Sequence, residues 1–202
     1  MVMSDNPTWD CRGIGERNLD DPQAGDAGKQ GEGKGGVARM VKHIKKLDQI
    51  CLVVRDLQKT IEHYWTDFGI GPWKIFLFEE PLLREMTVKG KPAKYRILIG
   101  MCQMENIYFE IIQPLAGDTT YQEFLEQRGE GLHHLGFIVD DLDSEIKRFE
   151  SNGLRTVQTG RFQGGGFAYF DTQEKFGTIL ELIERSKPPN VPIRVWPENE
   201  SK

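Results

Sequence analysis

Two adjacent histidines, His133 and His134, begin a stretch that reads GLHHLGFIVDD over residues 131–141. Imidazole changes charge near neutral pH and is a common metal ligand, so these positions are the first candidates for chemistry. The stretch alternates like a β-strand, on which neighbouring side chains point to opposite faces. We therefore expect only one ring to face a site, and the alternation alone does not choose between them.

An internal repeat singles out His134. Residues 47–62 (LDQICLVVRDLQKTIE) align with residues 132–147 (LHHLGFIVDDLDSEIK) at an offset of 85, with five identities in sixteen positions. This offset places His134 opposite Gln49. Self-similarity of this kind indicates two copies of one structural unit.

Each copy carries the signals of a strand followed by a helix. The strand pattern ends at an aspartate, Asp56 or Asp141, which can cap a helix by accepting backbone N–H bonds. Apolar residues at helical spacing follow in both copies. Each predicted helix ends at a glycine, Gly69 or Gly153, which suits a left-handed cap.

The two halves also end alike, in a β-rich run with one glutamate among apolar residues. Residues 106–114 (NIYFEIIQP) carry Glu110, and residues 177–185 (GTILELIER) carry Glu181. Between helix and last strand, each half has room for two more strands. The sequence therefore predicts an α+β fold of two βαβββ modules, joined by a short helical segment near residues 120–127.

Four polar residues occupy equivalent places in the two halves: Gln49, Glu110, His134 and Glu181. One imidazole and three oxygen donors suit a divalent ion such as Zn, Co, Ni, Mn or Mg. Buried glutamates would be costly without such a partner. The alternative is that the histidine is structural and the glutamates face water. Because all four positions are related by the repeat, we favour one metal ion held by these residues.

Two neighbours are assigned other roles. We expect His133 to be structural or to support a neighbouring side chain by a hydrogen bond. Cys51 stands two residues past Gln49 on the same face, and we expect it to belong to the core.

Four further side chains are candidate substrate contacts: Arg96, Arg161, Phe167 and Tyr169. Three of them belong to the glycine-rich stretch RFQGGGFAYF, which lacks the GK[ST] of a phosphate-binding loop. We expect this stretch to form a flexible hairpin at the rim of the site.

Residues 46–185, with this repeat and these four positions, resemble the vicinal oxygen chelate superfamily. That superfamily includes glyoxalase I, methylmalonyl-CoA epimerase, extradiol dioxygenases and antibiotic-sequestering proteins. The resemblance implies that the two modules form a cup-shaped, partly open mixed sheet with flanking helices. It also implies a divalent metal bound through the four end-strand positions, a small-molecule substrate and a homodimer.

The resemblance further implies proton transfer next to a carbonyl, through an enolate stabilised by the metal, with Glu181 as the base. The stretches FEIIQPLAGD and GEGLHHLGF resemble the epimerase branch, which favours an epimerase or isomerase of a methylmalonyl-CoA-like acyl thioester. That branch has a second glutamate where this chain reads Lys94-Tyr95-Arg96. A two-base mechanism is therefore in doubt.

Two alternatives remain, a lyase and a binding protein, and the ligand set argues against a third. A glyoxalase-type lyase would act on a substrate other than a glutathione adduct, since Val53 and Pro114 replace the residues that hold glutathione. An extradiol dioxygenase needs a second histidine where this chain has Gln49. A non-catalytic, antibiotic-type binding protein would keep the cup and usually lose the ligands, which are all present here.

Composition narrows the class of protein. The chain has 202 residues and a formal net charge of −5, so it offers no basic surface for nucleic acid. No apolar run approaches the roughly 20 residues that span a bilayer, and no secretory signal pattern begins the chain. Three scattered cysteines fit a reducing compartment. We expect a cytoplasmic protein that binds neither nucleic acid nor membrane.

The first residues differ from the rest, because they are rich in glycine and charge and have almost no large apolar side chains. We predict a disordered or loosely attached extension at one end and a proline-containing tail at the other. The expected limits are 1–45 for the extension, 46–187 for the domain (modules 46–115 and 131–187, linker 116–130) and 188–202 for the tail.

Overall fold

The computed structural model describes residue 44 and residues 46–198. The expected N-terminal extension, apart from residue 44, lies outside the described residues. The strands are β1 (Lys46–Val53), β2 (Trp73–Phe78), β3 (Arg84–Val88), β4 (Lys91–Pro92), β5 (Arg96–Met104), β6 (Ile107–Ala116), β7 (Gly131–Ile138), β8 (Thr156–Phe162), β9 (Gly165–Phe170), β10 (Ile179–Glu184) and β11 (Arg194–Trp196). The helices are α1 (Leu57–Phe68), α2 (Thr120–Arg128), α3 (Leu142–Ser151) and α4 (Gln173–Phe176).

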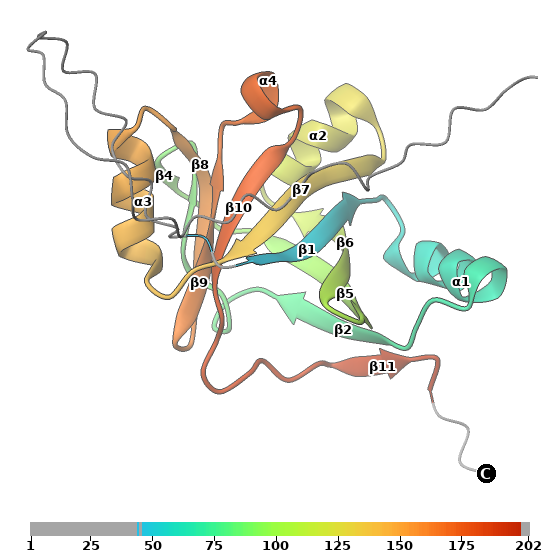
Figure 1. Ribbon diagram of the computed structural model, residues 1–202. Helices are drawn as coiled ribbons and strands as arrows, with labels where there is room; N and C mark the ends of the chain where they lie inside the picture. The colour runs from blue at the N-terminus through green and yellow to red at the C-terminus, as the bar shows by residue number, and fades with distance from the viewer. Residues whose placement is uncertain (1–43, 45, 199–202) are drawn as a thin grey trace, which may run out of the picture. The chain divides into compact units, whose positions relative to one another are not determined.

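All the strands belong to one mixed sheet in the order β11-β2-β5-β6-β1-β7-β10-β9-β8-β3-β4 (Figure 1). The central eight strands are arranged as a mirror-like pair, with β2-β5-β6-β1 on one side and β7-β10-β9-β8 on the other. The two halves join where β1 pairs antiparallel with β7. The sheet does not close on itself, so the prediction of a partly open α+β fold built from two modules is confirmed.

The helix ends follow the capping signals. Asp56 accepts a hydrogen bond from the backbone N–H of Lys59 at 2.9 Å, and Asp141 accepts one from Ser144 at 2.9 Å. Gly69 ends α1 in the left-handed region, with φ of 68°. These local signals explain why the same strand and helix form in both halves.

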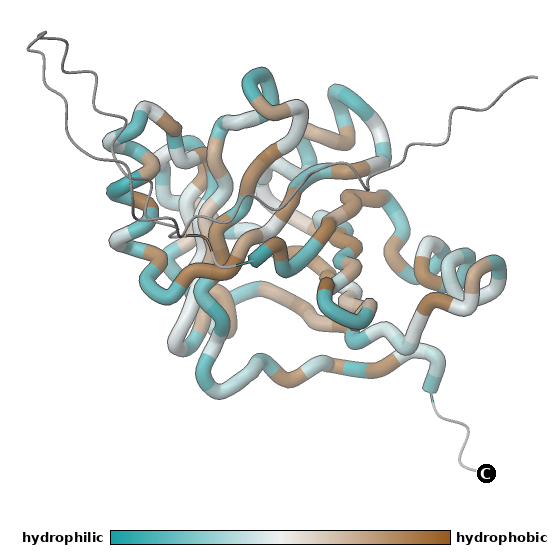
Figure 2. The backbone as a smooth tube through the Cα atoms, in the orientation of Figure 1, coloured by the Kyte–Doolittle hydropathy of each residue, from teal (hydrophilic) through white to brown (hydrophobic). Residues whose placement is uncertain are grey.

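Each half buries one helix against its own strands. In the first, α1 packs on β5 and β6, and Leu57 and Ile61 are fully buried beside Trp73. In the second, α3 packs on β9 and β10, where Leu142 meets Phe170. Figure 2 shows hydrophobic residues recurring along the central strands. A third buried cluster fills the space between the half-sheets.

Three strands were not predicted. The strands β3 and β4 belong to the first half in sequence, yet β3 pairs with β8 of the second half. The predicted proline-containing tail carries the short strand β11, which pairs with β2 and sets Trp196 opposite Trp73. Trp196 also meets Trp65 edge-on, with ring centroids 6.3 Å apart. Among the described residues, no helix is long and apolar enough to cross a bilayer.

Candidate metal centre

The four predicted ligand residues lie on four adjacent strands at the middle of the sheet. Gly136 on β7 is the neighbour of both Gln49 on β1 and Glu181 on β10. Cys51 on β1 is likewise the neighbour of both Glu110 on β6 and His134 on β7. Because these strands are hydrogen-bonded to one another, their register alone sets the four side chains side by side.

The polar atoms of these side chains converge on one point. The Nε2 atom of His134 lies 3.2 Å from a carboxylate oxygen of Glu110 and 3.1 Å from one of Glu181. The Gln49 amide nitrogen donates to the same two oxygens at 3.0 and 2.7 Å, and lies 3.4 Å from His134 Nε2. The structure therefore brings together all four side chains that the repeat selected.

These groups are buried. The exposed fraction is 0% for His134, 3% for Gln49 and Glu181, and 5% for Glu110. Two carboxylates removed from water in this way need a compensating positive charge, because an isolated buried charge is very costly.

The pKa values of His134 and Glu181 show how this positive charge is supplied. Burial alone would lower the pKa of His134, but the charges of Glu181 and Glu110 and its hydrogen bonds to them outweigh burial and raise this pKa to about 9. Burial raises the pKa of Glu181, although the nearby His134 opposes the rise. In the absence of an ion, a proton on the imidazole supplies the positive charge.

The residues fit a divalent cation. An amide's oxygen and nitrogen exchange places on a half-turn, so Gln49 can present its oxygen where its nitrogen now meets two carboxylate oxygens and the His134 ring. One nitrogen and three oxygen donors then face one point, a set suited to Zn, Co, Ni, Mn or Mg. The space is kept open by Gly136, where a Cβ would lie 2.4 Å from Gln49 Cγ and 2.8 Å from a Glu181 oxygen.

Cys51 stands at the edge of this cluster. Its sulfur lies within 4.8 Å of a possible ligand atom of Glu110 and of one of His134, so these three residues could by themselves hold an ion. Burial, followed by the charge of Glu110, raises the pKa of the Cys51 thiol well above its usual value. Cys51 is also fully buried in the central cluster, as expected for a core residue.

The expectation that His133 and His134 face opposite sides is wrong. The pairing of β1 with β7 is irregular here, since Cys51 pairs with His134 and Leu52 with Leu132, which leaves His133 without a partner in the register. An extra residue in a bulge re-aims its side chain. The two rings therefore lie on the same side, with their Nδ1 atoms 2.9 Å apart in a hydrogen bond.

Of the four candidate substrate contacts, two lie inside and two outside. Phe167 and Tyr169 are buried on β9 at 5% and 2% exposure, so the glycine-rich stretch is not a flexible rim at these positions. Arg161 forms an ion pair with Asp143, and Arg96 forms one with Glu79, all toward the surface. The arginines are thus engaged away from the metal cluster.

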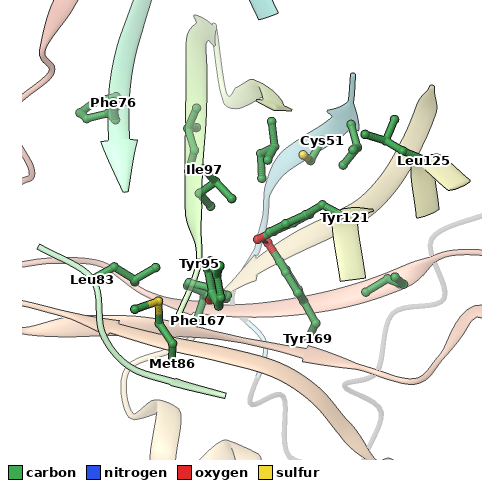
Figure 3. Close-up of a cluster of buried hydrophobic side chains, with 14 residues drawn as sticks. Cys51, Phe76, Leu83, Met86, Tyr95, Ile97, Tyr121, Leu125, Phe167 and Tyr169 are labelled. Carbon is green, nitrogen blue, oxygen red and sulfur yellow. Dashed lines mark hydrogen bonds between the residues drawn. The ribbon is translucent and has the colours of Figure 1, made fainter. Parts of the chain in front are cut away.

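Sequence reasoning missed Tyr121, which α2 brings into the interior. Its hydroxyl lies 2.8 Å from that of Tyr169, and Figure 3 shows the two hydroxyls meeting inside the central cluster. Tyr169 is in turn the strand neighbour of Glu181. The repeat carries no signal for Tyr121 because α2 belongs to neither copy. Its helical spacing to the other apolar residues of α2 is the signal that could have placed it in the interior.

Family comparison agrees with this geometry. The family model of the Glyoxalase/Bleomycin resistance protein/Dioxygenase superfamily matches residues 48–170. The chain belongs to this superfamily. The matched segment spans the first half, α2 and the second half as far as β9, and contains three of the four converging residues.

The superfamily relatives are distant. The uncharacterized protein YqjC of Bacillus subtilis (strain 168) is 24% identical over 144 residues, covering 70% of this chain and 93% of the relative. The solved methylmalonyl-CoA epimerase from Mycobacterium tuberculosis is 22% identical with a TM-score of 0.51, over 75% of this chain and 94% of that one. A methylmalonyl-CoA epimerase in complex with methylmalonyl-CoA and NH4+ is 20% identical with a TM-score of 0.53, over 74% and 99%. These structures support the shared fold.

Proposed function

We propose that this protein is a divalent-metal-dependent enzyme of the superfamily that moves a proton at the carbon next to a carbonyl. The observation that supports this most directly is the convergence of the His134 imidazole, two carboxylates and an amide on one buried point. A purely structural core would have no use for two buried carboxylates beside one imidazole.

An ion bound there would polarise a carbonyl oxygen and make the neighbouring C–H bond more acidic. Gln49, Glu110 and His134 serve to hold the ion. Glu181 has a second task, which is to accept the proton and return it. Burial raises the pKa of this carboxyl, so once a substrate displaces it from the ion it is a stronger base than an exposed glutamate.

The two tyrosines favour Glu181 over Glu110 as the mobile group. The nearby Tyr169 hydroxyl lowers the pKa of Glu181, which partly offsets the effect of burial. Tyr121 meets Tyr169 behind it at 2.8 Å. Burial raises the pKa of both hydroxyls well above their usual value, so both remain donors. Such a pair can steady the carboxylate after it leaves the ion.

The substrate class that we favour is a methylmalonyl-CoA-like acyl thioester, with epimerisation or isomerisation as the reaction. Support comes from the sequence stretches of epimerase type and from the fold shared with two methylmalonyl-CoA epimerases. Among the described residues no third carboxylate joins Glu110 and Glu181 in the cluster, so one glutamate would remove the proton, and epimerisation would require the enolate to be reprotonated on its other face.

Metal content is the first test. Protein purified without added metal and then loaded with each candidate ion should retain about one ion per chain. His134→Ala should lose it, whereas His63→Ala, an exposed histidine on α1, should not. Equal metal content in the wild type and in His134→Ala would contradict the proposal.

Proton transfer is the second test. Methylmalonyl-CoA in deuterated buffer should exchange its α-proton with the loaded protein, lose that exchange with a chelator and regain it when the ion returns. If no 2-substituted carbonyl compound exchanges while small aromatic antibiotics bind tightly, the protein is a binding protein instead.

A further inference from the structure

The candidate metal centre is closed to solvent. Its four side chains are between 0 and 5% exposed, and none of them lines the cavity beside α2 or the cavity beside Tyr95. A substrate that reaches the ion must therefore occupy space that side chains fill in this structure. The side chains that fill it decide which substrate fits.

A segment present in only one half supplies part of that filling. In the second half, β8 and β9 are joined by residues 163–164 alone. In the first half, the equivalent strands β2 and β5 are separated by residues 79–95, which carry β3 and β4. This segment leaves its own half and pairs with β8, so it crosses between the two half-sheets (Figure 1).

The crossing segment sends apolar side chains inward. Leu83 is 0% exposed and Met86 is 5% exposed, and both belong to the cluster that contains Cys51 and Tyr169 beside the metal centre. Figure 3 shows Leu83 and Met86 on the side of Phe167. Contact is close, since a Cβ at Gly160 would lie 2.8 Å from Leu83 and 2.7 Å from Phe167.

Leu83 and Met86 together form a wall of the buried interior. A cavity of about 280 Å³ lies immediately outside this wall. Met86 and Tyr95 line it and also belong to the buried central cluster, so they form the partition between cavity and interior. The Tyr95 hydroxyl donates to the backbone oxygen of Thr159 in the other half at 3.1 Å, which ties the partition across the two half-sheets.

We infer that Leu83 and Met86 are specificity-determining residues, which restrict the group carried next to the chelating carbonyl to a small, uncharged one such as methyl. The cavity outside Met86 takes the remainder of the substrate. This inference rests on the proposed function and assigns the substrate class of the same site.

The charge distribution explains why the restricted group is uncharged. Around the wall, the interior is aliphatic and aromatic. The cations of the cavity stand at its outer side and are engaged, Lys94 with Glu80 at 2.9 Å and Arg96 with Glu79. A charged group beside Leu83 would meet no partner, which is costly in an apolar interior.

The test uses two metal chelators that differ only in size, acetohydroxamate and benzohydroxamate. Each presents two vicinal oxygens to the ion of the loaded full-length protein, and binding is followed by calorimetry. In Leu83→Ala and in Met86→Ala, the affinity for benzohydroxamate relative to acetohydroxamate should rise at least tenfold over the wild type, in the range typical of an enlarged apolar pocket.

Leu142→Ala is the matched control, because Leu142 is also 0% exposed but lies in the separate cluster under α3. Its affinity ratio should equal that of the wild type. 4-Carboxybenzohydroxamate should gain nothing in the two wall variants. Met86→Ala removes less buried structure than Leu83→Ala. An unchanged affinity ratio in Met86→Ala overturns the inference, and if that variant still binds an ion, the proposed function stands. A wild type that binds no ion overturns both.

Discussion

The two halves of the sheet have the same order of elements but different side chains at equivalent places. Each half contributes the residue at the first strand and a glutamate at the last, with Gln49 and Glu110 from one, and His134 and Glu181 from the other. The shared backbone places four donors at one point. The differences between the halves then decide what each donor does.

The difference is sharpest two residues further along the first strand of each half. At the repeat offset, Cys51 of the first half corresponds to Gly136 of the second. Cys51 lies between Glu110 and His134, whereas Gly136 lies between Gln49 and Glu181. Next to Glu181, the missing side chain of Gly136 lets Gln49 and Glu181 approach each other closely, whereas a thiol stands next to Glu110.

Exchanging each glutamate for glutamine gives the largest expected contrast between the halves. Glu181→Gln should lower the exchange of the substrate α-proton by roughly 100-fold or more, because an amide cannot accept the proton. It should keep part of its metal affinity through the amide oxygen. Exchange is measured by NMR in deuterated buffer.

Glu110→Gln is the matched variant, since it removes the same charge from the other half. At saturating metal, its exchange should fall less than that of Glu181→Gln. Wild-type exchange in Glu181→Gln would place the base elsewhere, and equal losses in both variants would remove the distinction between the halves.

The next contrast tests the glycine against the cysteine. In Gly136→Ala, the added Cβ would lie 2.4 Å from Gln49 Cγ, so Gln49 and Glu181 must move apart and metal affinity should fall more than tenfold. Cys51→Ala should change metal affinity less than threefold, because Gln49, Glu110, His134 and Glu181 supply the donors. Competition with a fluorescent chelator measures both. A loss in Cys51→Ala as large as in His134→Ala would show a thiolate ligand.

The sequence predicted these halves because each unit carries its own local signals. Alternation, an aspartate cap and a closing glycine occur twice, and the register of hydrogen-bonded strands then brings Gln49, Glu110, His134 and Glu181 together. Such regularity is readable from a chain because every element agrees with the same unit.

What escaped prediction are the departures from the repeat. The crossing strand β3 pairs with residues of β8 that lie 70 to 77 positions away in the sequence, and short polar stretches such as REMTV do not specify such a partner. The bulge at His133 depends on the partner strand β1, which alternation within one strand cannot show. Applying the offset of 85 to every residue would have revealed the exchange of Cys51 for Gly136.

The imidazole of the second half also predicts a dependence on pH that the amide of the first half cannot give. Without metal, the folded state holds the pKa of His134 at about 9, above the ordinary value of 6.5. An ion must displace that proton, so apparent metal affinity should rise about tenfold per pH unit from pH 7 toward 9. Titrations at several pH values measure this slope.

The same shift has a sign for stability. The folded pKa is raised, so the metal-free protein should be most stable below pH 6.5 and lose stability as pH rises toward 9. Gln49 has no proton to lose, and His134→Gln should remove this slope. A metal-free wild type whose unfolding free energy is flat across this window would show that His134 is neutral at pH 7.

The smallest expected effect concerns the outer ends of the two halves, where β11 adjoins β2 and β3 adjoins β8. The wall formed by β3 faces the interior, whereas Trp196 of β11 meets Trp65 on the far side of the first half, with ring centroids 6.3 Å apart. Trp196→Ala should lower the free energy of unfolding by about 1–2 kcal/mol, the usual range for losing a partly buried aromatic contact. Metal affinity should stay within twofold of the wild type, since this contact touches no ligand strand.

Val191→Ala, at a side chain that is 81% exposed, is the control and should leave the free energy of unfolding unchanged. Urea titration with and without metal separates the outcomes: a Trp196→Ala variant that loses metal would show that the tail supports the centre, and that the two ends of the sheet are more alike than their contacts indicate.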